Sequence, residues 1–427
     1  MSNPKIILPQ SRRKFLSSAL VGGAALMAPS IVLGAPKKTP PGGVASSLPK
    51  QTISAADRQA ASGAAQLAQL QQQSPELGRI AQDALNYAKY SVMAAAAGAA
   101  GSSNDFADVA HAFVASRQPK ASAAYAAKAK QLLATPQSRA EFGSYAALDP
   151  DKLMSLSHAA VANQIGLKPA ADSAVTQLKT LNLAGMSRLD LLAGAPADSD
   201  ATPPVGKPSH NPDPGLAYKR LEFKIVWIRC LDSSGGVFEG DDELLIGGVV
   251  TGAQGAVVKV PQTYLGEFDD GDVYTWPDGG YVFHKYDLIT NKGWPTYYSA
   301  TVALADQDDG GFADFLNALW SKIGSYITSA ISAAATAGLG AALGAAFGGL
   351  GAVVGAVVGA LIGWLISLVH NEDDIIGTQT ATLSLGGDSL SYYNWAKLTS
   401  PGGLAGIMSF SDDGFYRLQY SWRVSKT

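Results

Sequence analysis

The sequence predicts an α+β multidomain chain, with an N-terminal all-α helical bundle and a C-terminal antiparallel β-sandwich that a Gly/Ala-rich helical hairpin interrupts. Two changes of pattern carry this prediction. Helix-forming residues dominate 52–193, whereas apolar and polar residues alternate with a period of two in much of 218–427. Within this second part, 327–369 contains no Asp, Glu, Lys or Arg, which is unusual for a sandwich loop.

The composition excludes several classes of protein. Charged residues make up only 16% of the 427 residues, and the formal net charge is −3. A protein that binds nucleic acid through bulk positive charge is therefore excluded. The single cysteine cannot form a disulfide framework, a zinc ribbon or an iron–sulfur site.

Residues 1–35 have the pattern of an export signal. Basic residues precede an uncharged apolar stretch, Leu16–Val32, and small residues follow it. The motif that resembles the bacterial twin-arginine (Tat) signal consists of Arg12, Arg13, Phe15 and Leu16. This resemblance implies export across the bacterial inner membrane, to the periplasm or the medium. The alternative is an N-terminal membrane anchor, for which the apolar stretch is short.

The next two segments differ sharply in composition. Residues 36–51 are rich in proline, lysine, glycine and serine and predict a disordered leader. The following domain, 52–193, predicts helices at 55–73, 76–100, 105–116, 119–134 and 150–164. We expect Ser54 to cap the first helix, with Asp57 at its third position, and Pro75 to lie in the first turn of the second.

The Pro- and Asp-rich segment 194–217 predicts an interdomain linker. After it, the domain 218–427 predicts short strands at 221–231, 243–251, 256–260, 282–288, 297–305, 375–385, 390–398 and 416–424. Turns rich in glycine, aspartate and proline separate these strands, as is typical of an antiparallel sandwich. The hydrophobic hairpin insert covers 312–370.

The insert predicts two apolar helices of about 20 residues, 327–347 and 350–369, with a turn at Gly348–Gly349. Glycines at every fourth position would line one helix face and let two backbones approach closely, as in paired membrane helices. We expect Trp320, Tyr326 and Trp364 at a membrane–water interface. The predicted insertion residues are Trp320, Gly340, Gly344, Gly348, Gly351, Gly355, Gly359, Gly363 and Trp364. The alternative is a helical hairpin buried against the N-terminal helices of a soluble protein.

Acidic turns flank the strands and the insert. One ends at Gly240-Asp-Asp242, another contains Asp306-x-Asp308, and a third contains Asp373-Asp374. Dense carboxylates repel one another unless water or a cation neutralises them, and their hard oxygens suit Ca²⁺. This order of strands and acidic loops resembles C2-type β-sandwich domains, which bind calcium at one end and dock on membranes there. The resemblance implies calcium ligands at Asp232, Asp242, Asp306, Asp308 and Asp374. The alternative is acidic turns that only keep the domain soluble.

No catalytic motif favours an enzyme. The five histidines are scattered without metal-binding spacing, and no Gly-x-Ser-x-Gly motif is present. The sequence therefore predicts a secreted, non-enzymatic, membrane-active protein, toxin-like or pore-forming. It would dock on a lipid membrane with Ca²⁺ and insert its glycine-zipper hairpin, with several copies forming a homo-oligomeric pore. The alternative is an exported binding or structural protein whose hairpin stays buried and whose acidic loops recognise a surface or a glycan.

Overall fold

The computed structural model describes fifteen stretches of the chain: 43–49, 51–99, 119–156, 160–161, 220–233, 242–252, 257–277, 279–288, 296–306, 312–334, 340–368, 375–385, 398, 403–411 and 414–425. All of them belong to one compact unit, residues 39–427. The predicted signal residues Arg12, Arg13, Phe15 and Leu16 lie outside the described residues, as does the predicted linker, 194–217.

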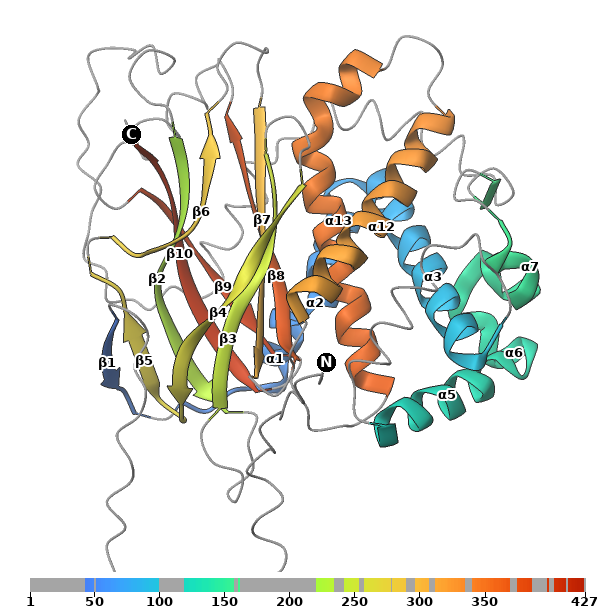
Figure 1. The fold of residues 1–427 in the computed structure, drawn as a ribbon, viewed down its shortest axis with the longest axis horizontal. Helices are drawn as coiled ribbons and strands as arrows, with labels where there is room; N and C mark the ends of the chain where they lie inside the picture. Colours follow the sequence, from blue (N-terminus) through green and yellow to red (C-terminus); the bar gives the residue numbers. More distant parts are fainter. Residues whose placement is uncertain are drawn as a thin grey trace, which may run out of the picture. The chain divides into compact units, whose positions relative to one another are not determined.

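The chain is mixed α+β, which confirms the coarse fold prediction, and its described strands form two antiparallel sheets (Figure 1). Sheet A contains, in spatial order, β1 (Val44–Ser47), β5 (Asp272–Thr275), β2 (Arg220–Asp232), β10 (Phe415–Ser425) and β9 (Leu404–Phe410), and β6 (Tyr281–Asp287) also pairs with β2. Sheet B contains, in spatial order, β4 (Val257–Phe268), β3 (Asp242–Thr251), β7 (Thr296–Asp306) and β8 (Ile375–Leu385).

The two sheets share one buried cluster of side chains. Successive side chains of a strand point to opposite faces, so alternate residues of β7, from Tyr298 to Leu304, enter this cluster. Large aromatic residues fill it. The ring of Phe223 in β2 lies 5.1 Å from the ring of Tyr420 and 4.7 Å from that of Trp422, both in β10, measured between ring centroids.

Aromatic rings also meet across the two sheets: the ring centroid of Phe268 in β4 lies 4.4 Å from that of Tyr274 in β5, and that of Tyr298 in β7 lies 5.4 Å from that of Tyr286 in β6. Large apolar side chains therefore fill the space between the sheets.

Three helices follow β1 along the chain: α1 (Ala55–Ala61), α2 (Gly63–Gln73) and α3 (Pro75–Ala97). The predicted caps are confirmed. The Ser54 hydroxyl accepts from the Asp57 backbone N–H while the Asp57 carboxylate accepts from the Ser54 backbone N–H, and Pro75 begins α3. Further along lie α5 (Pro119–Leu133), α6 (Pro136–Arg139), the 3₁₀ helix η2 (Ala140–Ala147) and α7 (Pro150–Met154).

The insert forms α12 (Phe312–Ala334) and α13 (Gly340–Leu368), together termed the arm below. The predicted turn at Gly348–Gly349 is wrong, because α13 continues through both residues. A glycine costs a helix only about 1 kcal/mol relative to alanine, so two of them among alanine and leucine do not end a helix that packing supports. The predicted bounds 327–347 and 350–369 are therefore wrong, since the first helix ends at Ala334 and the second begins at Gly340.

The arm packs between sheet B and the N-terminal helices (Figure 1). α13 lies against β7 and β8 on one side and against α2, α3 and α12 on the others. Side chains of these helices form one buried cluster with Val249, Ala303 and Ala305 of sheet B. The sequence predicts a separate core on each side of 194–217, whereas the described residues of the two sides share this cluster.

β1 lies within 36–51, which the sequence predicts to be a disordered leader. The prediction is wrong for Val44–Ser47, which pair with β5, Val44 lying opposite Thr275. The side chains of β1 are all exposed, so backbone hydrogen bonds to the edge of the sheet hold this strand. Such a strand needs no alternation of apolar residues, which explains why the sequence did not reveal it.

Candidate functional site

The glycines expected to pair membrane helices contact sheet B instead. A Cβ atom at Gly351 would overlap the Ser299 hydroxyl of β7, and one at Gly355 would overlap the Thr380 hydroxyl of β8. The missing side chains therefore let α13 approach the strands closely. Gly340, Gly344 and Gly348 also belong to α13, but their surroundings lie outside the described part of the chain. The four-residue glycine spacing thus has a structural explanation within the folded protein.

The same glycine face also contacts α2. A Cβ atom at Gly63 would overlap the carbonyl group of Gly359, and one at Gly359 would lie 3.3 Å from the Cα atom of Gly63. Two glycines facing each other allow the backbones of α2 and α13 to touch. Among the described residues, no helix combines the length and the hydropathy needed to cross a membrane.

Hydroxyl groups cover the face of sheet B beneath α13. The hydroxyls of Thr301 and Thr380 lie 2.7 Å apart and share a hydrogen bond. Three other buried hydroxyls, those of Thr251, Ser299 and Thr378, have no hydrogen-bond partner among the described residues. The contact between α13 and the sheet is therefore close, but these hydroxyls lower its contribution to stability. A buried hydroxyl without a hydrogen-bond partner costs about 1–3 kcal/mol.

The side chain of Gln66 in α2 hydrogen-bonds to the backbone of Thr380 in β8, the last strand of sheet B. Its amide nitrogen donates to the Thr380 carbonyl oxygen at 3.1 Å, and its amide oxygen accepts from the Thr380 N–H at 3.2 Å. The Gln66 side chain thus takes the two hydrogen bonds that a residue of an additional strand would make. It thereby covers the backbone of the sheet edge at Thr380.

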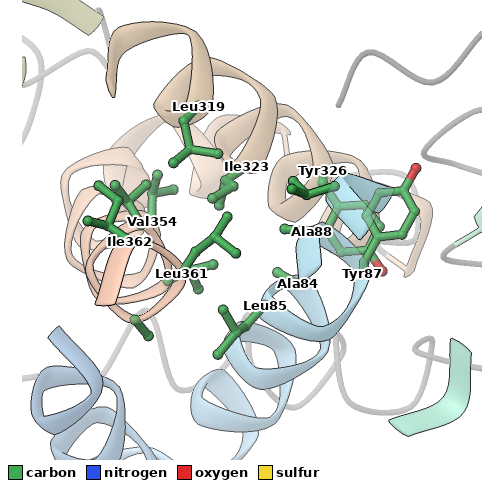
Figure 2. Packing of buried hydrophobic residues seen from close by; sticks show 14 of the residues in the cluster. Ala84, Leu85, Tyr87, Ala88, Leu319, Ile323, Tyr326, Val354, Leu361 and Ile362 are labelled. Carbon is green, nitrogen blue, oxygen red and sulfur yellow. The ribbon is translucent and has the colours of Figure 1, made fainter. Parts of the chain in front are cut away.

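Trp320 and Tyr326, which the sequence predicts at a membrane–water interface, are buried in the described structure. Trp320 is 2% exposed and Tyr326 is fully buried. Figure 2 shows Leu319 and Ile323 of α12 facing Val354 and Leu361 of α13, with Leu85 and Ala88 of α3 on the remaining side. The aromatic residues of α12 thus belong to the interior between three helices.

Tyr326 joins a small hydrogen-bonded cluster that connects three elements. The hydroxyls of Tyr326 in α12 and Tyr145 in η2 each lie 2.7 Å from the same Asp83 carboxylate oxygen of α3, and 2.6 Å from each other. Burial raises the pKa of Asp83, and the hydrogen bonds from the two tyrosines oppose that shift in part. Burial also raises the pKa of both phenols, so they act here as hydrogen-bond donors.

The predicted calcium ligands in the described part of the chain have other partners. Asp232, at the end of β2, forms an ion pair with Arg58 of α1. Asp242, at the start of β3, is 2% exposed and accepts a hydrogen bond from the Tyr416 hydroxyl of β10. A guanidinium group and a phenol thus each occupy one oxygen of these carboxylates.

The other predicted ligands lie at the end of β7 or outside the described residues. Asp306 ends β7, opposite Leu244 of β3, whereas Asp308 and Asp374 lie outside the described residues. Across the described stretches, no three His, Cys, Asp or Glu side chains are grouped so that they could hold a metal ion. Calcium binding by the acidic turns therefore stays a prediction.

A pocket of about 460 Å³ lies between α2, α3 and α13. Its apolar side consists of Leu67, Leu85, Ala360 and Trp364, and its polar side includes Gln71, Gln82 and Lys89. Two of the predicted insertion residues, Gly363 and Trp364, thus line this pocket. Its volume lies in the range of small-molecule sites, roughly 300–1,000 Å³.

Lys89 is the charged residue of this pocket. Its Nζ atom lies 4.8 Å from the centroid of the Trp364 ring, which is a cation–π contact. Burial lowers the pKa of Lys89, and the negative charge of the Glu141 carboxylate opposes that shift.

Side-chain amides form a hydrogen-bonded chain beside this ammonium group. Gln71 Nε2 donates to Gln82 Oε1 at 3.0 Å, and Gln82 Nε2 donates to Asn86 Oδ1 at 2.9 Å. The pocket therefore combines an apolar wall with a cation and amide groups, which is the usual composition of a ligand site.

No pattern in the sequence predicts this pocket. Its only signal is the spacing of Gln82, Leu85 and Lys89, which puts two polar residues on the buried side of α3 together with a leucine. Within an alanine-rich helix that spacing does not reveal a cavity, because the opposite wall comes from residues more than 270 positions later, Ala360–Trp364.

Comparison with protein-family models, with curated proteins and with solved structures found no match to this chain.

Proposed function

We propose that this protein is an exported, non-enzymatic binding protein in which the arm is a permanent part of the interior and the pocket between α2, α3 and α13 is the ligand site. In this proposal the N-terminal helices form a bundle that covers the arm, and the strands form a β-sandwich that the arm interrupts. The twin-arginine-like motif of Arg12 and Arg13 supports export to the periplasm or the medium.

This proposal rests mainly on one observation: the arm itself supplies part of the pocket lining. α13 supplies Ala360, Gly363 and Trp364, and α2 and α3 supply the rest. A protein that released the arm into a membrane would therefore lose its pocket. A function in ligand binding and a function in arm insertion exclude each other at this site.

Burial of the arm supports the same proposal. Val357, Leu361 and Ile323 are fully buried in the described structure. Each such side chain contributes about 1.5–3 kcal/mol by leaving water, and release of the arm would disrupt the whole cluster. The close glycine contacts with Thr380 and Gly63 add shape complementarity that only this arrangement uses.

A dye-release experiment tests the proposal. The mature protein is added to liposomes of phosphatidylcholine and phosphatidylglycerol, with and without Ca²⁺, at pH 7 and pH 5, beside a pore-forming peptide as positive control. We expect no release by the protein. The double variant Val354→Asp, Val358→Asp is expected to unfold at a lower temperature, since both valines are buried. Release by the wild type that a folded double variant does not show would contradict the proposal.

The membrane-active protein predicted from the sequence is the second candidate, and one observation favours it. The hydroxyls of Ser299 and Thr378 beneath α13 have no partners among the described residues. If the arm left, water would hydrogen-bond to these hydroxyls. Exposing this face of sheet B to water would therefore cost less free energy than exposing an apolar face. This candidate predicts Ca²⁺-dependent docking on a lipid membrane and assembly of several copies, and the same dye-release experiment distinguishes it from the binding protein.

A further inference from the structure

We infer that the pocket between α2, α3 and α13 binds a small amphipathic carboxylate, with the carboxylate group at Lys89 and the apolar part against Leu67 and Leu85. The inference rests on the proposed function, because the pocket exists only while the arm is in place.

The charge of Lys89 provides the first argument. The side chain is half-buried and lies over the Trp364 ring, and no ion pair of Lys89 occurs among the described residues. An ammonium group taken out of water without a close counter-ion is costly. A ligand carboxylate at this point would supply the missing counter-ion and a charge-assisted hydrogen bond.

The kind of anion follows from the donors present. Phosphate groups are usually bound by several cations or by backbone N–H groups at a helix N-terminus. This pocket offers one ammonium group and the amides of Gln71 and Gln82. Each amide nitrogen carries two N–H groups, and the hydrogen-bonded chain uses one of each. One positive charge with neutral donors matches a carboxylate monoanion.

The opposite side of the pocket suits an apolar body. Leu67 and Leu85 are each 4% exposed, and Ala360 continues the same surface on α13. Ala64 and Ala68 of α2 are exposed pocket residues, and their small side chains leave an opening to solvent. A linear or aromatic hydrocarbon part entering beside α2 can therefore reach the leucines while its carboxylate stays near Lys89.

Calorimetric titration of the mature protein with three ten-carbon probes tests this inference. Decanoate carries the predicted charge, decanol carries none, and decylamine carries the opposite charge. We expect decanoate to bind at least tenfold more tightly than decanol, and decylamine to give no binding. Equal affinities for decanoate and decanol, or no binding of decanoate, would overturn the inference.

Two pairs of variants assign the result to this pocket. Lys89→Met is expected to remove the preference for the acid, whereas Lys130→Met, at an exposed position of α5, should keep it. Ala68→Trp should block decanoate binding, and Ala60→Trp, exposed on α1, should not. An acid preference that survives Lys89→Met overturns the inference.

The two proposals fail in different experiments. If decanol binds as tightly as decanoate, the proposed binding function stands, and only the inference that the ligand is a carboxylate is refuted. Dye release by the wild-type protein that a folded Val354→Asp, Val358→Asp variant does not show would instead overturn the binding function itself.

Discussion

The two faces of sheet B are buried by different means. One face meets sheet A through large side chains such as Tyr298, Val302 and Leu304. The other face meets α13 through Ser299 and Thr380, which lie against Gly351 and Gly355. Adjacent residues of β7 therefore take part in two unlike interfaces, one that depends on apolar volume and one that depends on close approach.

This difference matters for what each interface tolerates. Between the sheets, the hydrophobic effect supplies the free energy, and the loss of a large side chain leaves a cavity. Beneath α13, glycine and serine bury little apolar area, so the close fit of the two backbones is the main contribution. We expect the first interface to be most sensitive to lost atoms and the second to added atoms.

The largest effect is expected from Phe223→Ala, in the buried cluster that the two sheets share. The Phe223 ring is fully buried and lies within 5.8 Å of the Phe283, Tyr420 and Trp422 rings, measured between centroids. Its removal should lower the free energy of unfolding by about 3–5 kcal/mol. Urea denaturation followed by circular dichroism measures this change. A loss below about 1 kcal/mol would show that the Phe223 ring contributes little to this cluster.

Gly355→Ala tests the interface beneath α13 by adding one methyl group. The new Cβ atom would overlap the Thr380 hydroxyl, so we expect a loss of about 1–3 kcal/mol in the free energy of unfolding. Gly324→Ala in α12 is the matched control, because its nearest atom would be Val354 Cγ2 at 3.8 Å. The control should gain about 0.5–1 kcal/mol from helix propensity. Equal changes in both variants would refute the close approach of α13 to the sheet.

The smallest effect separates two hydroxyls on the same face of β7. Ser299→Ala removes a buried hydroxyl that has no partner among the described residues, so stability should stay the same or rise by up to about 1 kcal/mol. Thr301→Val removes the partner of the Thr380 hydroxyl and should cost about 1 kcal/mol. Thermal unfolding of both variants gives the comparison. A similar loss for Ser299→Ala would mean that its hydroxyl is hydrogen-bonded.

Much of the secondary structure could be predicted from local pattern. The Ser54 cap, the start of α3 at Pro75 and the strands β2, β7, β8 and β10 follow from capping residues and from alternation. β5 and β9 were missed, and β4 extends well beyond the predicted 256–260. These strands gain their stability from partners distant in the sequence, such as the pairing of β9 with β10, which no local pattern reports.

The candidate site could be predicted less well. Gly363 and Trp364 were singled out for an expected place in a membrane, and they line a pocket with Lys89 instead. The composition of this segment marks both residues as unusual, but it does not identify their neighbours in the folded protein. The acidic residues Asp232 and Asp242 show the same limit, since their partners Arg58 and Tyr416 lie 174 positions away in each case.

The sequence by itself determined that an uncharged helical segment would present glycines at every fourth position and would have to be kept from water. Only the tertiary structure decided which surface those glycines meet. A missing side chain permits close approach to any neighbour, whether a second helix in lipid or the strands β7 and β8 in a protein interior. The spacing therefore specifies a short distance between backbones, and the partner at that distance is set by the fold.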